Sequence, residues 1–153
     1  MKANNRIPKR LAKKLANVAR AIEPHRGEIA EWTSPVSETI AMGHIRPALE
    51  REGVLVLTSV DRIESMDTQR CGRVTVAHTT HALVVADSGE KILLNSCGVA
   101  PTHPSTPGLD SEPGSGTDGP RQAAWIAMAQ ALMRVFQLPT AANRPSGWGT
   151  SKS

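Results

Sequence analysis

Three carboxylates lie close together in the sequence and have the chemistry of a metal-dependent enzyme. Asp61, Glu64 and Asp67 offer oxygen ligands of the kind that hold Mg²⁺ in nucleases. An ordinary solvated hairpin loop has the same composition and needs no ion. A metal-dependent nuclease is therefore one alternative for this chain.

A second group consists of thiols and imidazoles, namely Cys71, His78, His81, Cys97 and His103. Zinc sites use these residue types at short and regular spacings, and here the spacing is irregular. Two of the histidines are three residues apart in an expected strand, so they should face opposite sides. The sequence also has no P-loop or HExxH motif. We expect no catalytic centre, no bound metal and no cofactor.

Positive charge is concentrated near the N-terminus. Residues 1–26 contain eight lysines and arginines against one acid, Glu23, although the formal charge of the whole chain is only +4. A localised cationic cluster attracts polyanions more strongly than an evenly mixed surface does. A solvated helix face without a partner is the alternative.

Binding of single-stranded nucleic acid rests on two physical sources, phosphate contacts and base stacking on aromatic rings. The chain has no tyrosine, one phenylalanine and three tryptophans, so phosphate contacts should dominate. Each candidate is also explained as an ordinary surface charge. The candidates are Arg10, Lys13, Lys14, Arg62, Arg70, Arg73, Lys91, Arg121 and Arg134.

The elements that would position these side chains follow from hydrophobic periodicity. Apolar residues at four-three-four spacing predict a helix over 9–22, with basic residues on another side. Pro24 and Gly27 should end it. A second helix is expected over 37–52 and should stop at Gly53.

Residues 54–63, 72–86 and 91–100 are rich in Val, Leu, Ile and Thr and predict strands. The tight turn at 87–90 joins the last two, and the polar stretch 64–71 should be a longer loop. The predicted fold is α+β, with an antiparallel three-stranded meander packed against helices.

Residues 101–120 are almost entirely Pro, Gly, Ser, Thr and Asp, and we expect a flexible loop. A last helix is predicted over 121–137, with Pro120 in its first turn. That helix is apolar around most of its circumference, so either a neighbouring subunit or the N-terminal helices must cover its second side. We expect one domain over 1–140 and a disordered tail over 141–153.

The two cysteines lie in apolar stretches, so we expect reduced, buried thiols rather than a disulfide framework. No stretch approaches the roughly 20 apolar residues of a membrane span. We expect a soluble cytoplasmic protein without membrane contact.

Three segments carry a resemblance to a known family. They are the run IRPALEREGVLVL at 45–57, the hairpin ADSGEKI at 86–92 and the closing run ALMRVFQLPT at 131–140. Together they resemble the essential recombination function (ERF) family of phage single-strand annealing proteins. The family's Gly-Ser-Ala and Arg-Arg-Tyr stretches are replaced by RQA at 121–123 and MAQ at 128–130.

The resemblance implies a β-β-β-α core that assembles into rings or filaments, holds single-stranded DNA in a basic groove and anneals it without cofactor or nucleotide hydrolysis. It also implies the cytoplasm of a bacterial host, with an exonuclease or single-strand-binding protein as a further partner. The tail lacks the acidic residues that would recruit the latter. Besides the nuclease, the remaining alternative is a non-annealing basic adaptor protein.

Overall fold

The computed structural model describes residues 6–70, 72–102 and 119–138. Helical segments come first: α1 (Lys9–Ile22), η1 (Glu23–His25), α2 (Arg26–Ala30) and α3 (Val36–Arg51). The first helix has its predicted bounds, and α3 begins and ends one residue before the prediction. The short helix α2 was not predicted.

Pro24 explains why the chain remains helical where an end was expected. It lies in the first turn of η1, where a missing backbone N–H costs no hydrogen bond. The chain therefore changes direction at η1 and continues into α2. On α2, Ile29 is fully buried.

The strands form the predicted antiparallel meander. They are β1 (Val54–Thr68), β2 (Gly72–Val85) and β3 (Lys91–Pro101), in the sheet order β1-β2-β3. In the turn between β2 and β3, Gly89 has φ +72°, which glycine adopts without steric cost. The α+β class with a three-stranded antiparallel sheet is confirmed.

The predicted loop at 64–71 is wrong. β1 continues to Thr68, and its polar second half pairs with β2 from Arg62 opposite His78 to Thr68 opposite Gly72. A bulge between Val60 and Arg62 shifts the register. Because this half of an edge strand lies largely in solvent, its polar composition is compatible with a strand.

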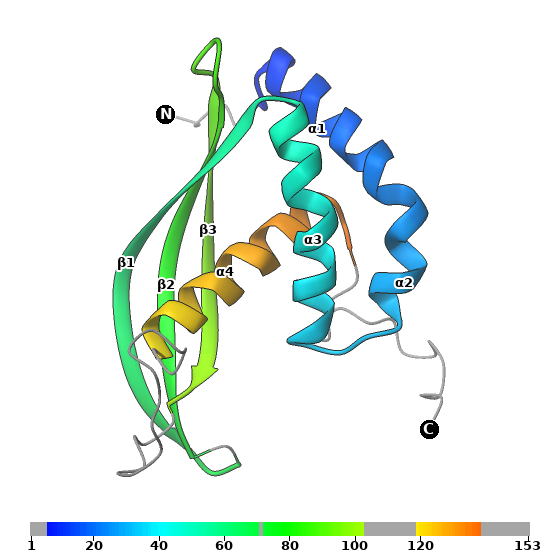
Figure 1. Ribbon diagram of the computed structural model, residues 1–153. Coiled ribbons are helices and arrows are strands. Elements are labelled where there is room, and N and C mark those ends of the chain that lie inside the picture. The colour runs from blue at the N-terminus through cyan, green and yellow to red at the C-terminus, as the bar shows by residue number, and fades with distance from the viewer. Residues whose placement is uncertain (1–5, 71, 103–118, 139–153) are drawn as a thin grey trace, which may run out of the picture.

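Helix α4 (Gly119–Val135) crosses one face of the sheet, as Figure 1 shows. It begins two residues before the prediction and has Pro120 in its first turn, as predicted. Its first half approaches β2 and β3 through small side chains. Gly98 makes this possible, since a β-carbon there would lie 2.6 Å from the backbone N of Ala127 and still closer to the Ala123 carbonyl O. The other members of this contact are Ala77, Ala100 and Ile126.

The second side of α4 is covered by the N-terminal helices of the same chain. Leu132 and Met133 are fully buried in a core that α1 and α3 share with the upper half of the sheet. The sequence allowed either a neighbouring subunit or the N-terminal helices to cover this side, and the structure shows the N-terminal helices there. The apolar residues that α1 and α3 bury in this core are Leu11, Leu15, Val18, Ile22, Ala41, Met42, Ile45, Ala48 and Leu49.

Arg26 ties α2 to the end of α4. Its guanidinium donates hydrogen bonds to the carbonyl oxygens of Phe136, at 2.8 Å, and Gln137, at 3.1 Å. The last carbonyls of a helix have no partner within it, so a cation is a favourable cap. The start of α2 is therefore held on α4.

Two predicted segments lie largely outside the described residues. These are the loop at 101–120, of which only 101–102 and 119–120 are described, and the tail at 141–153. Across the described ranges, no helix is long and apolar enough to cross a membrane.

Replacing Gly98 by alanine should destabilise the fold, because the new methyl group meets α4 backbone rather than a movable side chain. We expect a loss of at least about 1–3 kcal/mol in the free energy of unfolding. Gly43→Ala is the matched control, since nothing lies within 4 Å of a β-carbon there and the site is inside a helix. That variant should gain up to about 1 kcal/mol. Urea denaturation measures both, and equal stabilities would contradict the close approach.

Candidate nucleic-acid interface

The basic surface begins on α1. The helix has no acidic residue among Lys9–Ile22, and its buried stripe of leucine, valine and isoleucine determines which side faces solvent. Arg10, Lys13 and Arg20 are exposed. The cations of this helix are Lys9, Arg10, Lys13, Lys14 and Arg20.

Two acidic residues approach this helix. Lys14 donates from Nζ to the backbone O of Glu52 at 2.7 Å, and Asn17 donates to its Oε2 at 3.1 Å. Near the helix start, the backbone N of Leu11 donates to Glu90 Oε2 at 3.3 Å. Lys14 is thus partly held by the end of α3, whereas Arg10 and Lys13 form no ion pair with the described residues.

The other predicted phosphate contacts do not join α1 in one track. Lys91 starts β3 beside the acid Glu90, at the end of the sheet nearest α1. Arg70 and Arg73 lie at the β1–β2 turn, which is the opposite end of the sheet in Figure 1. Arg121 is in the first turn of α4.

The two remaining candidates, Arg62 and Arg134, interact with side chains of the same chain. Arg62 forms an ion pair with Glu64 at 3.4 Å, and its guanidinium lies 3.3 Å from His78 Nε2. Arg134 donates to Ser96 Oγ at 2.9 Å. Within one chain, the structure groups the α1 cations, and the other candidates in the described ranges do not join them in one track.

The three carboxylates of the nuclease alternative are not gathered either. Strand alternation places Glu64 on the open face of the sheet and Asp67 on the face toward the helices. Asp61 lies at the bulge, where it accepts hydrogen bonds from Ser59 and Thr80. Among the described residues these carboxylates form no metal-binding group.

The open face of the sheet, which no helix covers in Figure 1, has a polar band across its middle. Glu64 accepts from His78 at 3.0 Å, and this hydrogen bond, with Arg62 nearby, lowers the pKa of Glu64. Cys97 is exposed on this face, opposite His78, so the expectation of a buried thiol is wrong for that residue. Side chains of β3 point alternately to the two faces of the sheet. Cys97 therefore points outward, and its neighbour Gly98 points inward.

Apolar side chains flank the polar band. Leu57 is 57% exposed and Leu93 is 62% exposed, on the two outer strands of the open face. Leu55, Met66 and Val99 share that face and are about half exposed. At least half of the surface of each of these five side chains is therefore in solvent.

His81 lies on the opposite face, fully buried beneath α4. Its Nε2 is 2.8 Å from Thr79 Oγ1, and that hydroxyl donates to the carbonyl O of Ser96. The Thr79 hydroxyl must therefore accept from Nε2–H, which leaves Nδ1 to accept from Thr58 Oγ1 at 3.0 Å. This network holds a neutral imidazole. The prediction that His78 and His81 face opposite sides is confirmed.

Sequence reasoning missed one cluster of possible ligands. His25, Glu28 and His44 point toward one another from η1, α2 and α3. The spacing of His25 and Glu28, one helical turn, was a visible signal. His44 lies 19 positions after His25, in a different helix, so the sequence did not indicate that it belongs to the cluster.

Comparison of the chain with protein-family models, with curated proteins and with solved structures finds no match.

Burial lowers the pKa of His81 below its usual value, with Asp61 opposing and Arg134 reinforcing the shift. Between the lowered pKa and about 6.5, the unfolded chain binds more protons than the native one. Stability should therefore fall as pH drops below about 6.5. His81→Gln should flatten this dependence while costing about 1–3 kcal/mol at pH 7, because buried hydroxyls lose a partner. Thermal unfolding from pH 7 to 5 measures it.

His78→Gln is the control, since that histidine pairs with Glu64 on the open face. Its removal should leave the acid-induced loss in place. An unchanged pH dependence in His81→Gln would contradict the buried neutral imidazole.

Proposed function

We propose that this protein binds single-stranded DNA through the basic face of α1 and anneals complementary strands as an oligomer. The observation that carries the proposal is a helix with no acid and four exposed cations, Lys9, Arg10, Lys13 and Arg20. Such a face tracks phosphates, and it offers little that would read base edges. The order β1, β2, β3, α4 also matches the core that the family resemblance implies.

Phosphate contacts suit an annealing protein for a physical reason. A strand held by its backbone keeps its Watson–Crick edges free to pair with a second strand. Stacking would occupy the bases, and aromatic residues are scarce: Trp125 is packed against the core, and Trp32 is half exposed. The α1 face therefore favours holding DNA over reading it.

We infer that the open face of the sheet is covered by a second copy of the chain. Apolar residues on β1 and β3 flank a polar band there. β1 is also an edge strand of 15 residues, and one side of its backbone has no strand partner among the described residues. Each added copy would bring another α1 face to the assembly.

The variant Arg10→Glu, Lys13→Glu tests the DNA contact. It should weaken binding to an oligonucleotide and flatten the dependence of log K on log salt by about 1.4, from about 0.7 for each lost phosphate contact. It should also slow duplex formation when complementary oligonucleotides are mixed with the protein. Fluorescence anisotropy and a pairing assay measure the two effects.

Arg70→Glu, Arg73→Glu is the matched control, with the same charge change at the far end of the sheet. A general electrostatic effect would weaken both variants equally, and the proposal requires a larger loss from α1. Binding without accelerated pairing would indicate a non-annealing binder. If the protein does not bind DNA even at low salt, the basic adaptor becomes the favoured function. Degradation of DNA that depends on Mg²⁺ would indicate a nuclease.

The variant Leu57→Lys, Leu93→Lys tests self-association. Buried lysines at an interface between copies cost free energy, so the assembly should dissociate to smaller species. Light scattering after size-exclusion chromatography measures the mass. Val36→Lys, at an exposed apolar residue on α3, should leave the mass unchanged. A wild-type chain that is monomeric at high micromolar concentration would contradict the proposal.

A further inference from the structure

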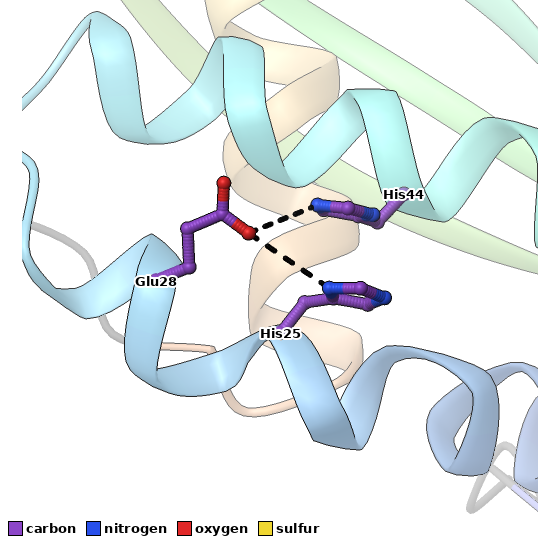
Figure 2. Close-up of side chains that lie close together, drawn as sticks. All are labelled: His25, Glu28 and His44. Carbon is purple, nitrogen blue, oxygen red and sulfur yellow. Dashed lines mark ion pairs between the residues drawn. The ribbon is translucent and has the colours of Figure 1, made fainter.

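Two imidazole rings and a carboxylate meet between η1, α2 and α3, as Figure 2 shows. Glu28 Oε2 lies 3.8 Å from His25 Nδ1 and 3.5 Å from His44 Nε2. The rings are stacked, with centroids 3.7 Å apart and an angle of 9° between their planes. All three ligand atoms lie within 4.8 Å of one another.

The hydrophobic core sets this arrangement. Ile29 and Ile45 are fully buried, and each directly follows a member of the cluster in the sequence. Arg26, which follows His25, is bound to the end of α4. The backbones that carry the three side chains are therefore held in place by packing on either side, which preorganises the cluster.

The distances do not fit ordinary hydrogen bonding. Protein N–H···O bonds are about 2.7–3.2 Å between heavy atoms, and both nitrogen–oxygen pairs here are longer. The 3.5 Å pair has the spacing of two ligands on one cation, and the 3.8 Å pair is slightly longer. Zn–N and Zn–O bonds of about 2.0–2.2 Å in a tetrahedron place neighbouring ligand atoms about 3.3–3.6 Å apart. The stacked rings would have to rotate apart for both in-plane nitrogen lone pairs to point at one ion.

The donor set selects the class of ion. Two imidazole nitrogens and one carboxylate oxygen suit Zn²⁺ and its first-row neighbours, whereas Mg²⁺ and Ca²⁺ take oxygen ligands. The side chains of His44, His25 and Glu28 are 30%, 39% and 54% exposed, so an ion can enter and water can complete its shell. We propose that these residues bind one divalent transition-metal ion, which links α2 to α3.

Calorimetric titration of EDTA-treated protein with ZnCl₂ at pH 7.5 tests the proposal. The wild-type chain should bind one Zn²⁺ at this site, and His44→Gln should weaken it at least about 100-fold, since even outer-shell changes cost about 10–100-fold. Glu28→Gln should weaken it as well, and its exposed position keeps the fold intact. Binding should decline at pH 5.5, because protons compete for the imidazoles.

Two controls locate the ion. His78→Gln removes a histidine that also pairs with a glutamate, and Cys71→Ser, Cys97→Ser removes both thiols. Neither should change zinc affinity at the cluster. Zinc should also raise the melting temperature of the wild type and not of His44→Gln, while Mg²⁺ should raise neither. Absence of zinc binding by the wild type, or unchanged affinity in His44→Gln and Glu28→Gln, would overturn the proposal.

Discussion

The approach of α4 to the sheet at Gly98 is the constraint on which the other features depend. A helix backbone can reach β3 at this point because Gly98 has no side chain and the nearby inward residues Ala77 and Ala100 are small. The contact places α4 across one face, where it buries His81 and brings Arg134 to Ser96. α3 and α1 then pack on the remaining side of α4 and complete the core.

This arrangement gives the two faces of the sheet different chemistry. The covered face holds a neutral histidine in a network of threonine hydroxyls. The open face holds a polar band of paired charges between half-exposed leucines. The proposed surface for self-association and the proposed surface for DNA are thereby separated, since the cationic helix α1 lies on the far side of the core from the open face.

Charge by itself did not reveal which cations are available. Nine basic residues had equal standing in the sequence, yet Arg62 and Arg134 are bound to neighbours within the chain, and Lys14 is partly held by Glu52. The exposed cations of α1 remain available to a ligand because the helix itself contains no acidic residue. A continuous track along DNA requires several copies, which makes the oligomer part of the proposed binding site.

The sequence by itself determined the local structure: α1 and the three strands from their periodicity, the turn at Gly89, and the opposite orientations of His78 and His81. These depend on residues a few positions apart. Tertiary structure decided the length of β1, the cover of α4, the exposure of Cys97 and the meeting of His25 with His44. Each of these depends on which surfaces distant segments bury, and that depends on packing between elements rather than on local pattern.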